Sequence, residues 1–248
     1  MSERTPFSPR EAEHRYQQLL ARLEANEREF RRLGRSVLRV QEEERRRLAR
    51  DLHDGVGQNL TALKHRLAQL AETVAPEAVG LRTALDEAVA LCADTLEDTR
   101  ALSRLLRPAV LDDLGLEPAL RWLAHSVGEA AGITVAVEIE PLPALDGEWQ
   151  TLLFRVTQEA LNNIAKHARA RSVLVRLVER AGALQLQVVD DGRGFDPAAL
   201  PAGHGSGLGG LRERLQLFDG RLEVRSAPGH GTRLRAVVPL AGDPPLTA

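Results

Sequence analysis

The N-terminal part of the chain alternates apolar and polar residues with the spacing of a long helix. Residues 10 to 73 contain no proline, and apolar side chains recur at Leu19, Leu23, Phe30, Leu33, Val37 and Val40. This pattern predicts one long helix. The last four positions are separated by three, four and three residues, as in the seam of a coiled coil. The spacing therefore favours pairing with a second copy of the chain.

The apolar series continues beyond this segment and predicts a helical hairpin. It runs through Leu48, Leu52, Val56, Leu60, Leu63, Leu67 and Leu70. A second helix is expected from Pro76 to Arg107, because proline suits a first helical turn and Pro108 would end the helix. A single hairpin leaves its apolar stripe exposed, whereas two copies bury it in a four-helix bundle. We therefore expect a homodimer.

The C-terminal half consists of short β-rich runs separated by helical segments. Strands are expected at residues 133–139, 173–178, 184–189, 222–225 and 234–238, and helices at residues 148–168 and 208–218. Helices packed on a mixed sheet form an α/β sandwich. The predicted fold class is therefore α+β, with an N-terminal helical hairpin forming a dimeric four-helix bundle, followed by the sandwich.

Composition and charge narrow the function classes. The formal net charge of -2 creates no field that attracts nucleic acid, so direct nucleic-acid binding is not expected. Cys92 is the single cysteine, which excludes an intramolecular disulfide and a cysteine-rich metal site. No apolar run reaches the roughly 18 residues of a membrane span, and the N-terminus lacks a signal-peptide core. The expected location is cytoplasmic, with no membrane span in this chain.

Residues 42–47 are all charged, and the three arginines in the second half of this run are similar to a nucleic-acid-binding patch. Its first half is acidic, however, and Glu43 lies four residues before Arg47, where the two side chains can pair on a helix. We interpret this run as a solvated helix face.

The first candidate site is His53, in the middle of the first hairpin helix. Leu52 and Val56 are expected to point inward, and helix geometry turns His53 by about 100° from Leu52, toward solvent. Asp54 could hold one ring nitrogen and leave the other free as a nucleophile. Gln58, four residues after Asp54, could position a water for hydrolysis. Taken alone, however, a surface histidine beside an aspartate is usually an ordinary surface pair.

The second candidate site is a polar stripe on the helix expected at residues 148–168. Glu159, Asn163, Lys166 and His167 share one side of this helix, whose other side is apolar. Asn163 is a candidate oxygen ligand to Mg²⁺, and Lys166 or His167 would meet phosphate charge. An ordinary polar surface explains the stripe equally well when it is considered alone.

Two glycine-rich segments follow. The strand expected at residues 184–189 leads directly into Asp190, whose carboxylate could accept the exocyclic amine of adenine. Gly192 and Gly194 would let the backbone approach the base, although a plain Asp-Gly turn is the alternative. The second segment opens a helix, where backbone amides suit phosphate, and its candidate residues are Gly205, Gly207, Leu208 and Gly209.

The order of these parts separates them from other nucleotide-binding motifs. No Gly-Lys-Ser/Thr follows the second glycine segment, so this segment is not a Walker loop. The asparagine helix comes first, then the acidic strand end, then the glycine loop, and Gly229-His230-Gly231-Thr232 leads into the final strand. This order resembles the GHKL superfamily of ATP-binding domains, with its N-box, G1 box, G2 box and closing Gly-x-Gly-Thr.

Together with Leu-His-Asp-Gly-Val-Gly-Gln at residues 52–58, the chain resembles the nitrate-sensor-like subfamily of two-component sensor histidine kinases, over residues 40 to 240. The resemblance implies that His53 is phosphorylated, Asp54 is its acid/base partner and Gln58 is a phosphatase glutamine. In the ATP-binding domain it implies that Asn163 holds Mg²⁺, Glu159 orients a water or acts as a base, and Asp190 reads adenine. It further assigns nucleotide contacts to the glycine boxes and to Thr232.

The resemblance also implies a domain organisation and partners. It divides the chain into an N-terminal signalling helix or coiled coil (1–39), a dimerisation and histidine phosphotransfer domain (40–118), a catalytic ATP-binding domain of GHKL type (119–241) and a disordered tail (242–248). The phosphoryl group of Mg·ATP would pass through His53 to an aspartate in the receiver domain of a response regulator.

Two alternatives stay open from the sequence. A GHKL-fold serine kinase of the anti-sigma type is one, although such kinases lack a dimerisation hairpin that carries a histidine. The other is a non-catalytic dimeric module whose nucleotide site is only structural, and the intact Asn163, Asp190 and glycine boxes count against it.

Overall fold

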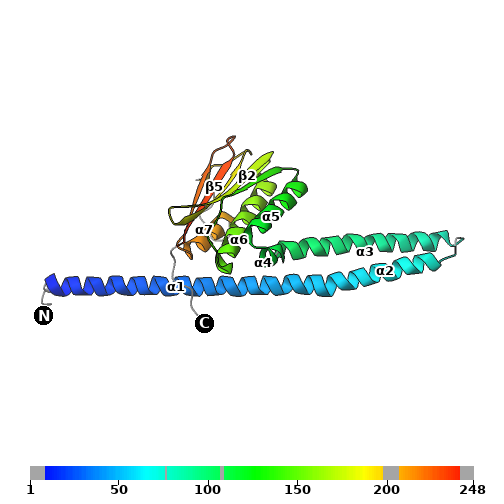
Figure 1. The fold of residues 1–248 in the computed structure, drawn as a ribbon, viewed down its shortest axis with the longest axis horizontal. Helices are drawn as coiled ribbons and strands as arrows, with labels where there is room; N and C mark the ends of the chain where they lie inside the picture. The colour runs from blue at the N-terminus through cyan, green and yellow to red at the C-terminus, as the bar shows by residue number, and fades with distance from the viewer. Residues whose placement is uncertain (1–8, 76, 107–108, 198–206, 241–248) are drawn as a thin grey trace, which may run out of the picture. The chain divides into compact units, whose positions relative to one another are not determined.

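The structure is a computed structural model that describes residues 9–75, 77–106, 109–197 and 207–240 (Figure 1). In chain order its elements are α1 (Pro9–Asp51), η1 (Leu52–Gly57), α2 (Gln58–Thr73), α3 (Val79–Leu106), α4 (Ala109–Asp113), α5 (Leu116–Ala131), β1 (Thr134–Ile139), α6 (Gly147–Asn163), η2 (Ile164–Ala168), β2 (Ser172–Arg180), β3 (Ala183–Asp190), α7 (Gly207–Gln216), β4 (Arg221–Ser226) and β5 (Thr232–Pro239). Among these described elements, no helix combines the length and the apolar character needed to cross a membrane.

The chain divides into two compact units. The hairpin unit comprises residues 39–126 and 145–155, and the sheet unit comprises the residues up to Leu38, residues 127–144 and residues 156–248. Three helices, α1, α5 and α6, contribute residues to both units. Each unit is described by itself below.

The apolar spacing predicted one long helix over residues 10–73, and the hairpin unit contains its part from residue 39 onward. Residues 10–73 are helical throughout, but Leu52–Gly57 form a π turn, η1, instead of an α-helix. Helix α3 packs against α2, with Ala71, Cys92 and Leu96 buried. The Ser103 hydroxyl donates a hydrogen bond of 2.9 Å to the backbone carbonyl of Ala49 and ties α3 to the end of α1.

The second hairpin helix starts later than predicted. A turn in which the Ala78 N–H donates to the Ala75 carbonyl (3.0 Å) precedes it, so α3 begins at Val79 and not at Pro76. The expected last residue, Arg107, lies outside the described residues.

The π turn also changes which side chains face inward. Leu52 is half-buried as expected, and Val56 is 43% exposed in the single chain, so its inward orientation in a bundle of two copies stays a prediction. Gly57 is the buried residue of the turn, and a Cβ there would lie 3.9 Å from the Leu96 side chain. A π turn contains more residues than an α-helical turn, so side chains after Leu52 no longer follow α-helical spacing.

Helices α4 and α5 lie between the hairpin and the first strand, in a region where the sequence analysis predicted no helix. In α5 the residues Leu116, Leu120 and Leu123 are buried, with intervals of four and three residues. Pro118 stands in the first turn of α5, where proline is tolerated. The helical signal was therefore present in this segment.

The sheet unit contains a five-stranded mixed sheet in the order β1-β2-β3-β5-β4. Strands β1 and β2 are parallel, and the other neighbouring pairs are antiparallel. All five predicted strands are present, and their ends lie within two residues of the predicted ends. The mixed sheet with helices packed on it confirms the predicted α+β fold class.

Strand β3 packs one face against the helices of the sheet unit and ends at Asp190. Along β3 buried and half-buried residues alternate, as expected for a strand with one face packed against helices. The helical side of this core comes from the C-terminal half of α6 and from α7, and it includes the buried side chains of Val156, Leu161, Leu211 and Leu215. The antiparallel register of β3 and β5 places Asp190 opposite Thr232 at one end of the sheet.

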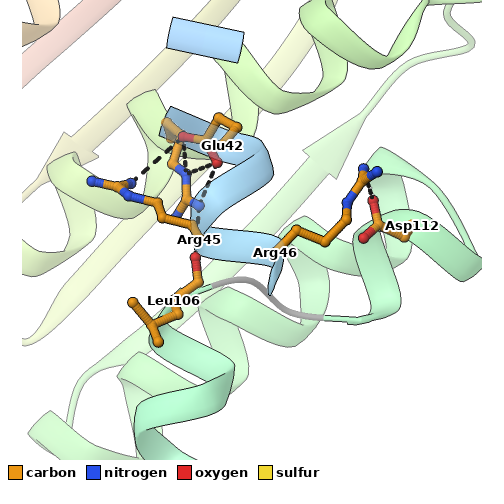
Figure 2. A network of polar contacts seen from close by, with 6 residues as sticks. Glu42, Arg45, Arg46, Leu106 and Asp112 are labelled. Atoms are coloured by element: carbon orange, nitrogen blue, oxygen red, sulfur yellow. Dashed lines mark hydrogen bonds and ion pairs between the residues drawn. The ribbon is translucent and has the colours of Figure 1, made fainter. Parts of the chain in front are cut away.

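The charged run at residues 42–47 was interpreted as a solvated helix face, and for its first residue this was wrong. Glu43 and Glu44 are exposed, and Glu44 pairs with Arg47 at 2.7 Å as a surface ion pair. Glu42, however, is only 8% exposed. Its carboxylate forms a buried ion pair with Arg155 of α6 (Figure 2).

Candidate functional site

The π turn η1 brings His53 and Gln58 to one pocket. These residues are five positions apart, which would place them about 140° apart around an α-helix. In a π-helix the backbone hydrogen bonds run between residues five apart, so such positions stack on one side. Both side chains are exposed and line an open pocket of about 320 Å³ in the hairpin unit. The structure therefore brings together the predicted phosphoacceptor and the predicted phosphatase glutamine.

The remaining walls of this pocket include residues that the sequence analysis did not select. Thr61 and His65 come from α2, and Thr99 and Arg100 come from α3. The Thr61 hydroxyl donates to the Gly57 carbonyl of η1 and the Thr99 hydroxyl donates to the Thr95 carbonyl of α3, both at 2.8 Å. Arg100 brings a guanidinium group, which suits phosphoryl oxygens. Thr61 and His65 follow Gln58 on the same helix, whereas the packing of α3 on α2 brings Thr99 and Arg100 to His53, and no local motif marks that pair.

Asp54 is exposed next to His53, and it does not line the pocket. Within the described part of the chain, no hydrogen bond joins its carboxylate to the His53 ring. Catalytic hydrogen bonds often tighten only when substrate is bound. The role of Asp54 as an acid/base partner stays a prediction.

In the sheet unit, Glu159 and Asn163 contact the start of α7. Glu159 and Asn163 are one turn apart on α6, and the Asn163 Nδ2 donates to the Glu159 Oε1 at 3.0 Å. A Cβ at Gly207 would overlap the Glu159 carboxylate and would lie 3.2 Å from the Asn163 Nδ2. Glycine at position 207 therefore lets the N-terminus of α7 approach these two polar side chains closely.

The arrangement at Asn163 fits a role in holding Mg²⁺. Because its amide nitrogen donates to Glu159, the amide oxygen is the group left for a cation. Mg²⁺ typically takes one or two protein ligands and keeps its waters and the phosphate oxygens of a nucleotide. In the described ranges, no three His, Cys, Asp or Glu side chains gather into a cluster that could hold a metal ion.

Lys166 and His167 were predicted to continue the polar stripe of α6 with α-helical spacing. The α-helix ends at Asn163, however, and Ile164–Ala168 form a second π turn, η2. Both side chains are exposed. The strict α-helical stripe was therefore wrong beyond Asn163, and a phosphate contact by Lys166 or His167 stays a prediction.

Asp190 ends strand β3 as a buried carboxylate, 6% exposed. Its Oδ1 accepts a hydrogen bond of 2.8 Å from the Gly192 N–H. Burial raises the pKa of Asp190 above its ordinary value, and hydrogen bonds from Gly192 and Thr232 oppose this shift in part. A buried carboxylate at a strand end suits recognition of a donor such as the adenine amine.

The neighbouring Asp191 has a different environment. Its carboxylate accepts hydrogen bonds from the N–H groups of Ser172 (3.0 Å) and Arg171 (2.7 Å) and from the Ser172 hydroxyl (2.8 Å). These bonds, led by the Ser172 N–H, lower the pKa of Asp191. Asp191 therefore fixes the start of β2, and Asp190 is the acidic residue of the pair that suits a ligand.

The glycines around Asp190 allow close packing of the backbone. A Cβ at Gly192 would lie 2.8 Å from the Asp190 Oδ1 and would overlap the Ala168 carbonyl oxygen. Gly231 has φ +67°, and a Cβ there would overlap the Asp190 carbonyl oxygen. A Cβ at Gly194 would overlap the Ala227 carbonyl oxygen, in the loop between β4 and β5. In this loop the Gly229 N–H donates a hydrogen bond of 2.6 Å to the Arg193 carbonyl. The predicted glycine box and the closing Gly-x-Gly-Thr segment thus meet at Asp190.

The other predicted nucleotide residues lie around these groups. Thr232 is half-buried, and its Oγ1 lies 3.1 Å from the Ser226 Oγ. Leu208 and Gly209 are half-buried in the first turn of α7. Gly205 lies outside the described residues. The sequence analysis missed Ser226, which also accepts from the Phe195 N–H at 2.9 Å and donates to the Gly231 carbonyl at 2.8 Å.

Two family models match the parts of the chain that contain these two sites. A family model described as histidine kinase matches residues 44–111. A second model, described as histidine kinase-, DNA gyrase B-, and HSP90-like ATPase, matches residues 149–242. The chain belongs to the sensor histidine kinase family. The matches cover the His53 segment of this histidine kinase and its Asn163, Asp190 and Thr232 positions, and they support its membership of the nitrate-sensor-like two-component type with an ATP-using domain.

Two curated relatives extend the similarity over most of the kinase chain. It is 36% identical over 217 residues to the sensor histidine kinase MctS of Rhizobium johnstonii, covering 86% of this chain and 47% of that protein. It is 34% identical over 217 residues to the signal transduction histidine-protein kinase/phosphatase DegS of Brevibacillus brevis, covering 86% and 55%. The chain thus spans about half the length of these relatives.

Solved structures that are similar to this histidine kinase include two other kinases. The histidine kinase domain of the blue-light activated histidine kinase from Erythrobacter litoralis EL346 is 21% identical, with a TM-score of 0.48, over 74% of this chain and 95% of that one. The mycobacterial sensor histidine kinase MprB is 24% identical, with a TM-score of 0.40, over 49% and 92%.

Proposed function

We propose that this chain phosphorylates His53 from Mg·ATP and passes the phosphoryl group to an aspartate of a response regulator. The observation that carries the proposal is the exposed imidazole of His53 in an open pocket shared with Gln58. Such a position lets a phosphoryl donor and then a receiver domain approach the same ring. The buried Asp190 and the Glu159–Asn163 pair support a separate nucleotide site in the sheet unit.

In this proposal the nucleotide is held at both ends. Asp190 accepts the exocyclic amine of adenine, and Thr232 reaches the base through water. Asn163 would hold Mg²⁺, which neutralises phosphate charge, while Lys166 and His167 meet the phosphate oxygens. Glycines of the two boxes and Leu208 contact the nucleotide through the backbone at the N-terminus of α7, where the helix dipole favours anions.

The transfer step uses the two ring nitrogens of His53 differently. The lone pair of one nitrogen attacks the γ-phosphorus in line, and the bond from this phosphorus to the bridging oxygen breaks, so the electron pair leaves with ADP. The proton on the other nitrogen passes to Asp54, which leaves the imidazole ring uncharged and the transferred phosphoryl group anionic. Glu159 orients the reacting groups at the nucleotide. Positioning and charge neutralisation supply most of the rate.

We further propose that Gln58 supports hydrolysis of the phosphorylated regulator. Its amide shares the pocket of His53 and is able to orient a water where the receiver aspartate docks. The DegS relative is named a histidine-protein kinase/phosphatase, which supports a dual activity.

The proposed assembly is a homodimer. Val56, Leu63 and Leu70 are 43%, 47% and 53% exposed and recur every seven residues along the first hairpin helix, which suits a helical bundle between two chains. We propose the same domain organisation as the sequence analysis, with a signalling helix (1–39), a phosphotransfer hairpin (40–118) and an ATP-binding domain (119–241), and the predicted tail (242–248) lies outside the described residues. Because ATP is the donor in this proposal, we also assign these domains to the cytoplasm.

The experiment incubates the purified chain with γ-labelled Mg·ATP beside its His53→Gln and Asn163→Ala variants. We expect a label that is stable in alkali and labile in acid, and that is lost in both variants. Label that persists in His53→Gln but not in Asn163→Ala would move the acceptor to another residue. Acid-stable label would favour the serine kinase, and nucleotide binding with no label at all would favour the non-catalytic module.

A further inference from the structure

The sheet has two different faces. The C-terminal half of α6 and helix α7 pack on one face, where Leu186 and Val188 of β3 are buried (Figure 1). Gln185, Gln187 and Val189 alternate with these residues along β3 and are half-buried. Because successive side chains of a strand point to opposite sides, these three lie on the other face of the sheet. We call this second face the outer face.

One row of side chains across the outer face changes from apolar to basic. Leu174 of β2 is opposite Val189 of β3, and Val189 is opposite Arg233 of β5. Arg233 is in turn opposite Arg225 of β4. Leu174 and Val189 are half-buried, and both arginines are exposed. We call these four residues the outer row. It crosses four neighbouring strands, so three strand spacings of about 4.8 Å make it about 14 Å long.

The two arginines of the outer row stand side by side without an acidic partner. Directly opposite residues in antiparallel strands have Cβ atoms about 4.5–5.5 Å apart, and like charges at this spacing destabilise a sheet. Among the residues that the structure describes, neither Arg225 nor Arg233 forms an ion pair. Glu223, two residues before Arg225 on the same face, is shared between Arg221 (3.2 Å) and Arg235 (3.5 Å). The charges of Arg225 and Arg233 therefore stay uncompensated.

This arginine pair is a conflict between the sequence and the fold that a ligand would resolve. Arrangements that lower stability without a compensating contact are expected at functional sites. The formal net charge of the chain is -2, so the pair does not belong to a general excess of basic residues. A carboxylate between two guanidinium groups would remove their repulsion and accept charge-assisted hydrogen bonds. The pair therefore points to an anionic partner.

The surroundings of the pair favour a protein as this partner. Glu138 and Glu223 lie on the same face, one row away from the outer row. A nucleic-acid backbone or an anionic lipid surface carries negative charge over a wide area, so it would also meet these two carboxylates. Leu174 and Val189 add apolar surface next to the arginines, and arginine beside apolar residues is typical of protein interfaces.

We propose that the outer row docks an acidic amphipathic helix of a partner protein. Side chains at i, i+4, i+7 and i+11 form one stripe on a helix and rise by about 4.5–6 Å per step, close to the spacing of strands. Two apolar side chains of this stripe would cover Leu174 and Val189, and two carboxylates would meet Arg233 and Arg225. Asp190 lies on the packed face, so this surface is separate from the proposed nucleotide site and does not depend on the proposed kinase function.

The test measures how tightly the full chain binds a fluorescent helical peptide, by fluorescence polarisation. The peptide carries leucine at i and i+4 and glutamate at i+7 and i+11, and a second peptide has glutamine in place of both glutamates. Arg225→Gln and Arg233→Gln each remove one charge of the outer row. Arg221→Gln is the matched control, because it removes the same charge from the same face of β4, where the arginine is paired with Glu223.

We expect the wild-type chain to bind the glutamate peptide about tenfold more tightly than the glutamine peptide. Arg225→Gln and Arg233→Gln should each weaken binding of the glutamate peptide by about fivefold or more. Arg221→Gln should stay within about twofold of the wild type. The affinity for a fluorescent ATP analogue should change by less than about twofold in all three variants, because the row lies on the face opposite Asp190.

The repulsion between the two arginines has a signature of its own in the chain without peptide. At low ionic strength, Arg225→Gln and Arg233→Gln should each melt about 1–3 °C higher than the wild type in scanning calorimetry. Salt screens exposed charges, so this difference should disappear at about 0.5 M salt. Arg221→Gln should show no such rise, because it removes an arginine that has an acidic partner.

Equal binding of the two peptides would overturn the proposal, and so would an equal loss of affinity in Arg221→Gln. A loss of ATP-analogue affinity of about fivefold or more in Arg233→Gln would assign the arginines to the nucleotide site instead. Binding to vesicles of anionic lipid without binding to the glutamate peptide would replace the protein partner by a membrane. A chain that takes up no label at His53 but binds the peptide as expected would refute the proposed kinase function alone.

Discussion

His53 and Gln58 line the same pocket because the helix between them is a π turn. With α-helical geometry throughout, the two side chains would point in directions about 140° apart, and one water could not serve both. The π turn Leu52–Gly57 contains Gly55 and Gly57, which weaken the preference for an α-helix. A local change in helix geometry thus unites the proposed acceptor with the proposed phosphatase residue.

The shared pocket predicts a selective loss of phosphatase activity in Gln58→Ala. Without the amide, water is no longer oriented, and dephosphorylation of the phosphorylated regulator should fall by about tenfold or more. His53 should still accept a phosphoryl group, because its ring nitrogen is untouched. Asn59→Ala is the control, since Asn59 is an exposed neighbour that does not line the pocket. Equal phosphatase rates in wild type and Gln58→Ala would remove this role.

The approach of Gly207 to Glu159 predicts that Gly207→Ala weakens nucleotide binding. The new methyl group would overlap the Glu159 carboxylate, which has to move, and Asn163 would lose its hydrogen-bond partner. We expect about tenfold weaker binding of an ATP analogue, equal to roughly 1.4 kcal/mol. Calorimetric titration measures this value. Gly210→Ala on the same helix is the matched control, because a Cβ at Gly210 meets nothing within 4 Å. Comparable losses of affinity in both variants would contradict the proposed nucleotide site.

The buried carboxylate of Asp190 predicts how nucleotide affinity depends on pH. Its pKa is raised above 3.8 by burial, so the carboxylate takes up a proton at a higher pH than an ordinary aspartate does. The charged acceptor for the adenine amine is then lost, and affinity should fall as the pH falls through this raised pKa. Asp190→Asn should bind the nucleotide less tightly than the wild type, by about 1.5–3 kcal/mol in binding free energy, and its affinity should lack this pH dependence. Identical pH profiles for the two proteins would refute the assignment.

The same shift predicts an opposite effect on the stability of the protein without nucleotide. Because the folded pKa of Asp190 lies above the unfolded value, the folded state binds the proton more tightly, and this contribution is lost as the pH rises through the folded pKa. At pH 7 the ionised, buried carboxylate therefore costs stability. Scanning calorimetry at pH 7 should therefore give a higher melting temperature for Asp190→Asn than for the wild type. A lower melting temperature for the variant would contradict this prediction.

The exposed stripe of Val56, Leu63 and Leu70 predicts that Leu63→Glu separates the proposed dimer. A carboxylate in the interface would have to be buried without a partner, which costs several kcal/mol. Sedimentation velocity should show the mass of one chain for Leu63→Glu and of two for the wild type. Gln69→Glu adds the same charge at an exposed site off this stripe and should stay dimeric. A dimeric Leu63→Glu would move the interface elsewhere.

Much of the fold could be predicted from apolar spacing. The strands could be predicted because apolar residues at alternate positions, such as Leu184, Leu186 and Val188, indicate a strand with one buried face. Helix α5 was missed although Leu116, Leu120 and Leu123 have helical spacing, so more attention to this pattern would have found it. The two π turns have no periodic signature, because they depend on how neighbouring helices pack.

The candidate site was predictable where one segment carries its own pattern. Asp190 stands out because a buried strand rarely ends in a carboxylate, and Asn163 because it lies on a polar stripe. Arg100 and the Glu42–Arg155 pair could not be found in this way. Arg155 is 113 residues from Glu42, and a charged residue is expected at the surface unless its partner is known.

The central claim is that the imidazole of His53 receives the γ-phosphoryl group of ATP. It is tested most directly by incubating the chain with Mg·ATP, digesting it at neutral to alkaline pH and locating the phosphoryl group by mass spectrometry with electron-transfer fragmentation. The account predicts a phosphohistidine at His53 in the peptide that contains residues 51–58. A phosphoryl group found on a serine, a threonine or another histidine, with His53 unmodified, would contradict it.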